Sequence, residues 1–98
     1  MAFIAGLGIY LPQRRQTAAE IAAASGVPES IVRGKMGLEC KTVPGPDDHT
    51  NAMGIHAARD ALLDAKVHAQ ELDVVISITE EYKEFPVWTA GIKTAHEL

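Results

Sequence analysis

The chain has little of several features that mark particular protein classes. It holds one cysteine, Cys40, among 98 residues, so no internal disulfide can form, which is consistent with a reducing cytoplasm. No apolar run reaches the roughly 18 residues that a transmembrane helix needs. The N-terminus, MAFIAGLGIYLP, lacks a basic leader before Pro12. We therefore expect neither a membrane span nor a secretion signal.

Basic residues are also scarce. Nine Lys and Arg stand against 13 Asp and Glu, and the formal net charge is −4. Arg14-Arg15 is the only adjacent basic pair, whereas a nucleic-acid site needs clustered cations. Nucleic acid is therefore not an expected partner. The length and the 47% hydrophobic content predict one small domain or part of one, residues 1–98, without an internal boundary.

The first ten residues predict a strand with two packing glycines. Residues 2–10 are mostly apolar around Gly6 and Gly8, and Pro12 ends the pattern. A dinucleotide-binding loop would need a third glycine where this chain has Leu11. We expect the glycines to allow close approach of a neighbouring backbone.

Two short helices are predicted next. Thr17 and Glu20 have the capping-box spacing, so a helix should run to about Ser25, with Gly26 just past its end. Pro28 is suited to the first turn of a second helix that ends near Gly34. A turn, a short extended segment and a Pro-Gly-Asp loop should follow over residues 35–48.

Residues 50–65 form the clearest helical pattern in the chain. The apolar stripe consists of Ile55, Ala58, Leu62 and Ala65, widened by Met53, Ala57 and Ala61. The opposite, wetter side carries Arg59, Asp60 and Asp64. This pattern predicts an amphipathic helix that lies close against a sheet.

The stretch LDVVISITEEYKEFPVW, residues 72–88, contains the best functional candidate. Its β-branched run, residues 74–78, predicts a central strand of a parallel sheet, buried on both faces. Glu80 and Glu81 follow directly, at the strand end where ligands gather in open α/β sheets. Either one carboxylate faces a site or both lie in solvent on a loop.

Residues 87–98 predict a last helix, with no closing cap or polar tail after it. Two or three strands joined by helices also leave sheet edges unpaired. We therefore expect the chain to be a fragment, or to be completed by another chain.

Six segments form a recognisable set in this order along the chain: GLGIYLP, Thr-x-x-Glu, Met36-Gly37-Leu38, NAMGIHAARDALLDA, ELDVVISIT and EFPVW. The set resembles the first third of the 3-oxoacyl-(acyl-carrier-protein) synthase III group of the thiolase superfamily, to which the hydroxymethylglutaryl-CoA synthases are related. The resemblance implies an α/β fold: the N-terminal part of a thiolase-like αβαβα structure, with an incomplete mixed or parallel sheet and flanking helices.

The resemblance implies an acyltransferase that joins acyl thioesters by Claisen condensation in fatty-acid biosynthesis. Its substrates would be acyl-CoA and acyl carrier protein, with no separate cofactor, and it would act as a cytoplasmic homodimer. The family's catalytic Cys, His and Asn would lie beyond Leu98, so the 98 residues alone should be inactive. Alternatives are a hydroxymethylglutaryl-CoA synthase-like condensation and, from another class, a non-catalytic assembly module that pairs with a catalytic chain.

Four residues are carried over as site candidates. Glu80 matches the general acid/base that follows a Thr in the hydroxymethylglutaryl-CoA synthases, and desolvation would raise its pKa towards a useful range. Phe85 matches an aromatic ring that limits the acyl pocket across the dimer interface, or is a plain core residue. Lys35 and Met36 stand at the turn where the family binds CoA, although Lys35 lacks the planar face that stacks on adenine and could be a surface lysine.

Other reactive side chains give weaker signals. Cys40 falls in the extended segment, away from the helix start that a nucleophilic cysteine needs, and is predicted to be a bystander. The four histidines, His49, His56, His68 and His96, show no metal-ligand spacing.

Overall fold

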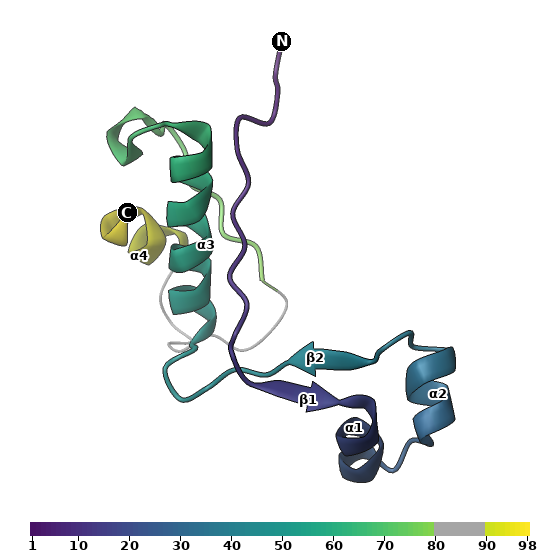
Figure 1. Ribbon diagram of the computed structural model, residues 1–98. Coiled ribbons are helices and arrows are strands. Elements are labelled where there is room, and N and C mark those ends of the chain that lie inside the picture. The colour runs from purple at the N-terminus through teal and green to yellow at the C-terminus, as the bar shows by residue number, and fades with distance from the viewer. Residues whose placement is uncertain (80–89) are drawn as a thin grey trace. The chain divides into compact units, whose positions relative to one another are not determined.

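The computed structural model describes residues 1–79 and 90–98 of the chain (Figure 1). Its contacts group these residues into two units, Leu11–Pro46 on one hand and Met1–Tyr10 with Asp47–Leu98 on the other. The elements in chain order are β1 (Arg15–Thr17), α1 (Ala18–Ser25), α2 (Glu29–Gly34), β2 (Cys40–Thr42), α3 (Thr50–Ala65), the short 3₁₀ turn η1 (Ala69–Glu71) and α4 (Ala90–Glu97). A single domain over residues 1–98 stays a prediction.

In Leu11–Pro46, the two strands form an antiparallel ribbon and the two helices pack against each other (Figure 1). Thr17 lies opposite Cys40 in the ribbon and is also the N-cap of α1. Its hydroxyl accepts from the Glu20 amide while the Glu20 carboxylate accepts from the Thr17 amide, so the predicted capping box is present. Gly26 has the left-handed conformation expected of a residue that ends a helix.

The second helix of this unit also begins and ends as predicted. Pro28 is the N-cap of α2, which ends at Gly34. Gly37 has φ of 68°, a conformation that favours glycine, and the Leu38 amide then donates to the Val32 carbonyl. Val32 and Ala18 are fully buried and form the small core of this unit. Strand β1 was not predicted, because its three residues show no apolar alternation.

In the other unit, α3 has the bounds that the periodicity predicted. Ile55 is buried and the remaining stripe residues are half-buried, whereas Arg59, Asp60 and Asp64 are exposed. Helix α4 packs against α3. The predicted last helix is confirmed from Ala90 onward, and its first predicted residues lie outside the described ones.

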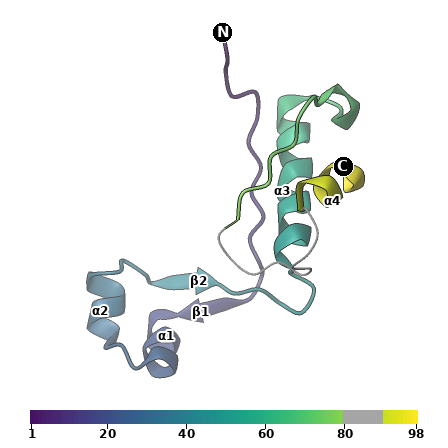
Figure 2. The same cartoon turned by 180° about the vertical axis from the view of Figure 1, so that it is seen from behind.

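Residues 1–10 run along α3 as an extended segment (Figures 1 and 2). A Cβ on Gly6 would lie 2.6 Å from the Ala65 amide nitrogen, and one on Gly8 would overlap the Ala57 carbonyl oxygen. The prediction of packing glycines is therefore confirmed, and the neighbouring backbone is that of α3. The predicted strand over residues 2–10 is wrong for the described residues, because this segment forms no ladder among them.

Residues 74–78 differ most from the prediction. They lie extended, outside any ladder among the described residues, and Val74, Ile76 and Ile78 are 72%, 79% and 89% exposed. The predicted central strand with two buried faces is therefore wrong here. A β-branched run reports a preference for burial and pairing, but the partners that satisfy it must come from elsewhere in the fold.

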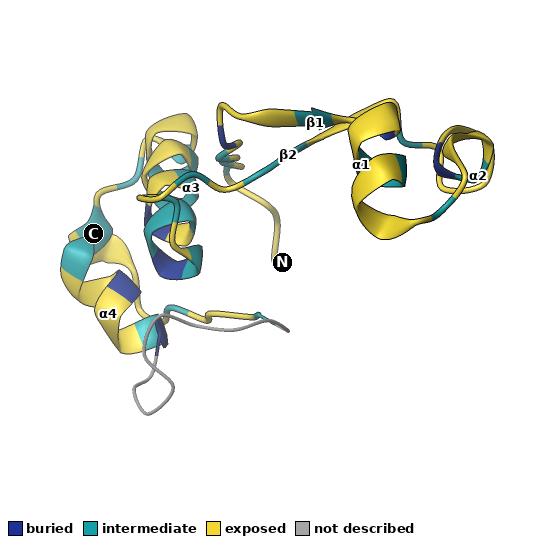
Figure 3. Cartoon of the chain, turned by 90° about the horizontal axis from the view of Figure 1, so that it is seen from below, coloured by how far each residue is buried: buried dark blue, intermediate teal, exposed yellow. Residues whose placement is uncertain are grey.

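Exposed surface predominates in the described residues (Figure 3). Within residues 1–79 and 90–98, the buried residues of the hydrophobic core are Ala18, Val32, Ile55 and Ala90. No helix in residues 1–79 and 90–98 has the length and apolar character needed to cross a membrane.

Candidate functional site

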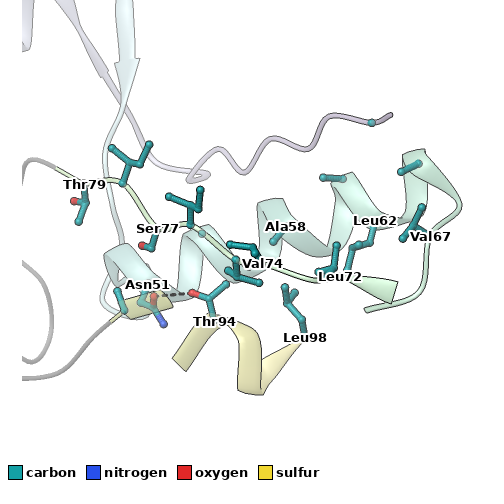
Figure 4. A pocket seen from close by; sticks show the side chains of 18 of the residues that line it. Asn51, Ala58, Leu62, Val67, Leu72, Val74, Ser77, Thr79, Thr94 and Leu98 are labelled. Atoms are coloured by element: carbon teal, nitrogen blue, oxygen red, sulfur yellow. Dashed lines mark hydrogen bonds between the residues drawn. The ribbon is translucent and has the colours of Figure 1, made fainter. Parts of the chain in front are cut away.

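A cavity of about 550 Å³ lies beside α3, lined also by residues of the N-terminal segment, of the extended segment 72–79 and of α4 (Figure 4). Leu62, Val67 and Leu72 gather at one end, and Asn51, Ser77 and Thr79 at the other (Figure 4). The cavity is thus mostly apolar, because Ile76 and Ile78 line it beside Ser77 and Thr79, and its few polar side chains gather towards one end. A mostly apolar cavity with a few polar groups is typical of ligand sites.

The polar end is organised by a buried hydrogen bond. The Thr94 hydroxyl donates to the Asn51 side-chain oxygen at 3.0 Å, which links α4 to the first turn of α3 (Figure 4). Only 8% of Asn51 and 9% of Thr94 are exposed. Sequence reasoning missed this pair, although Asn51 stands four residues before Ile55, in phase with the apolar stripe. A polar residue in that position was the available signal.

Two of the four predicted site residues, Glu80 and Phe85, lie outside the described residues. The described chain reaches Thr79, which lines the cavity and immediately precedes Glu80 in sequence. The structure therefore brings the segment that leads to Glu80 beside a cavity and leaves the role of the carboxylate a prediction.

Lys35 and Met36 lie in the other unit, at the C-terminal end of α2. Both backbone amides donate to the Ile31 carbonyl at 3.0 Å, and both side chains are exposed. The backbone at this turn is fixed while the two side chains face solvent, an arrangement open to a ligand.

Cys40 lies in β2, as the predicted extended segment requires, and its side chain is exposed. The Arg15 guanidinium lies 3.9 Å from its sulfur across the ribbon. Among the described residues, no group of three or more His, Cys, Asp or Glu side chains has the geometry of a metal site.

A second polar cluster lies where the chain enters α3. The Tyr10 hydroxyl donates to Asp48 Oδ1 at 2.5 Å, and the Tyr10 ring stacks on His56 with ring centroids 5.1 Å apart. The hydrogen bond to Asp48, with smaller effects of desolvation and of the negative charge, raises the pKa of Tyr10. This cluster joins residues 38 positions apart and was not predicted.

No protein-family model matches the chain. It is 39% identical over 83 residues to the hydroxymethylglutaryl-CoA synthase of Methanothermobacter thermautotrophicus, covering 84% of this chain and 24% of that protein. It is 29% identical over 92 residues to the beta-ketoacyl-[acyl-carrier-protein] synthase III of Hyphomonas neptunium, covering 93% of this chain and 28% of that protein. The chain thus spans about a quarter of the length of these curated relatives.

Among solved structures, the chain is similar to the priming beta-ketosynthase from the R1128 polyketide biosynthetic pathway. The TM-score is 0.82 at 28% identity, over 96% of this chain and 28% of that one. This likeness defines the class: the described elements are part of a thiolase-like α/β fold, and the predicted fold class is confirmed.

Within that class, the sequence is similar both to beta-ketoacyl synthases III and to hydroxymethylglutaryl-CoA synthases, as the resemblance predicted.

Proposed function

We propose that the protein to which this chain belongs joins two acyl thioesters by Claisen condensation. The observation that carries the proposal is the similarity, over most of the chain, to condensing enzymes in sequence and to a priming beta-ketosynthase in structure. In this proposal the chain supplies scaffold and substrate contacts, and the nucleophilic cysteine comes from sequence beyond residue 98.

The leading candidate is a synthase III-like reaction of fatty-acid biosynthesis, with acyl-CoA and acyl carrier protein as substrates and a homodimer as the active form. A hydroxymethylglutaryl-CoA synthase-like condensation is the second candidate. The 39% identity to the Methanothermobacter protein favours it, and so does Glu80 after Thr79.

Release of carbon dioxide separates the two reactions. The full-length protein would be supplied with an acyl-CoA and a malonyl thioester in one assay and with acetyl-CoA and acetoacetyl-CoA in another. Carbon dioxide release coupled to a 3-oxoacyl product supports the synthase III-like reaction. Release of free CoA from the second pair without carbon dioxide supports the hydroxymethylglutaryl-CoA synthase-like reaction, and no product in either assay contradicts both.

In the hydroxymethylglutaryl-CoA synthase-like reaction, Glu80 is the proposed general acid/base. In the synthase III-like reaction, Phe85 is the proposed wall of the acyl pocket. We expect Glu80→Gln to lower the condensation rate by about 10²–10⁴-fold, because the amide keeps the size of the carboxyl but cannot exchange a proton. Glu81→Gln is the matched control and should leave the rate within a few-fold. Equal rates for both variants and the unmodified protein would remove Glu80 from the mechanism.

Lys35 and Met36 are the proposed contacts to the CoA portion of the substrate. Leu11–Pro46 contains five Lys and Arg against three Asp and Glu, whereas the whole chain is acidic. The local excess of positive charge favours the phosphates of CoA at the exposed Lys35 side chain.

A further inference from the structure

Tyr10 and Asp48 lie at the two places where the chain passes between its units. Tyr10 is the last residue before Leu11–Pro46, and Asp48 is the second residue after it. The hydrogen bond between them joins the outgoing and the returning chain. This contact therefore holds together the two chain segments that flank Leu11–Pro46, although neither of its residues belongs to Leu11–Pro46.

Both partners are held on the same rigid element. The Tyr10 ring stacks on His56 of α3 at an interplanar angle of 21°, and the Gly8 backbone lies against Ala57 of the same helix. Asp48 directly precedes the N-cap of α3, His49, whose carbonyl accepts the first helical hydrogen bond from Met53. Groups that are already ordered lose little further entropy on pairing, so this hydrogen bond is effective in spite of partial exposure.

The closure continues inside Leu11–Pro46. The Val43 amide donates to the Arg14 carbonyl at 2.9 Å, and the β1–β2 ladder follows directly. Only short connectors separate this ladder from Tyr10 on one side and from Asp48 on the other. Holding the outer ends of the connectors together reduces the entropy that the ribbon must lose to pair.

We propose that Tyr10, Asp48 and His56 form a clamp that controls the local opening of Leu11–Pro46 independently of the unfolding of α3. The stacked ring aims the phenol, the Asp48 carboxylate accepts its hydrogen bond, and helix α3 holds both partners in place. The raised pKa of Tyr10 is consistent with a phenol that stays protonated beside a carboxylate. The clamp does not depend on the proposed reaction.

Amide hydrogen exchange of the full-length protein tests the clamp. Tyr10→Phe removes the hydroxyl but keeps the ring that stacks on His56, so the fold is retained. We expect exchange of the β1, β2 and α2 amides to accelerate about threefold to tenfold, while amides in the middle of α3 stay unchanged.

Asp64→Ala is the matched control. The Asp64 carboxylate accepts from the Leu7 amide at 3.0 Å, so it also ties the N-terminal segment to α3, but away from the passage between units. It should leave exchange in Leu11–Pro46 unchanged. Equal acceleration in both units, or none in Leu11–Pro46, would overturn the clamp.

A double-mutant cycle tests whether Tyr10 and Asp48 act through the hydrogen bond between them. Asp48 makes further interactions, so Asp48→Ala alone exceeds the effect of Tyr10→Phe. If the pair is the clamp, adding Tyr10→Phe to Asp48→Ala causes no further acceleration in Leu11–Pro46. Additive effects would instead show two independent contacts and overturn the proposal.

Discussion

The two units of the chain are specified over different distances in the sequence. In Leu11–Pro46, Thr17 and Glu20 form a capping box three positions apart, Gly26 ends α1, and Gly37 turns the chain after α2. The ribbon alone pairs more distant residues, such as Thr17 with Cys40. In the other unit, the N-terminal segment contacts α3 some fifty residues later, and Asn51 contacts Thr94. Local signals therefore define the helices of the first unit, whereas contacts between distant segments define the second.

The difference also appears in what is left exposed. The first unit buries Ala18 and Val32 completely, while the second exposes most of the β-branched run at 74–78. A unit that is specified by local signals can bury its apolar residues against partners within a short stretch of sequence. A unit built from distant contacts needs every partner in place before its apolar residues are covered.

The largest expected effect of a single substitution on stability is at Gly8, in the unit of residues 1–10 and 47–98 that is defined by contacts between distant segments. A Cβ at this position would overlap the backbone of Ala57 and Ala61, which cannot move without distorting α3. We expect Gly8→Ala to cost about 3 kcal/mol of unfolding free energy or more. The midpoint and slope of urea unfolding measure this change.

Gly54→Ala is the control within α3, because nothing lies within 4 Å of the added Cβ. There we expect a gain of about 1 kcal/mol from helix propensity. Similar effects at both glycines would mean that residues 1–10 do not pack on α3, and the distinction between the two units would weaken.

A smaller effect is expected at the buried pair of the same unit. Thr94→Val keeps the shape of the side chain but removes the hydroxyl that donates to Asn51, at an expected cost of about 1–2 kcal/mol. Thr94→Ser retains the hydroxyl and serves as the control. Hydrogen exchange of the α4 amides should accelerate only in the valine variant, while that of the α1 amides stays unchanged; a change in α1 would argue against separate units.

The success of sequence reasoning followed the same division. The bounds of α3, the capping box of α1 and the end of α2 at Gly34 were predicted, because each depends on spacing or on a residue with one preferred conformation. Strand β1 was missed because three residues beside a helix cap leave no periodic pattern. The predicted strands over residues 2–10 and 74–78 were wrong because strand formation depends on partners that composition does not identify.

The residues of the candidate site also fall into those that the sequence predicted and those that only the structure revealed. Resemblance supplied Glu80, Phe85, Lys35 and Met36, of which the structure describes the last two, at the exposed turn after α2. The cavity and the Asn51–Thr94 pair emerged only from the arrangement of α3 and α4. Polar pairs between distant helices cannot be read from spacing, because neither partner reveals the other.

The smallest expected effect on stability is in Leu11–Pro46, at the N-cap of α1. Thr17→Ala removes the side-chain acceptor of the Glu20 amide and should cost about 1 kcal/mol, confined to Leu11–Pro46.

Titration of Glu20 measures the other half of this cap, the hydrogen bonds that its carboxylate accepts from Thr17. Hydrogen bonds from the Thr17 backbone, and secondarily from its hydroxyl, lower the pKa of Glu20. A carboxyl whose folded-state pKa is lowered stabilises the fold above its unfolded-state pKa, and this contribution is lost as the pH falls through the folded-state value. In Thr17→Ala, the Glu20 pKa followed by carboxyl NMR shifts should rise only part of the way, because the backbone amide remains. An unchanged pKa would show that the Thr17 hydroxyl does not donate to the Glu20 carboxylate, and the first turn of α1 would then be held by fewer contacts than the structure shows.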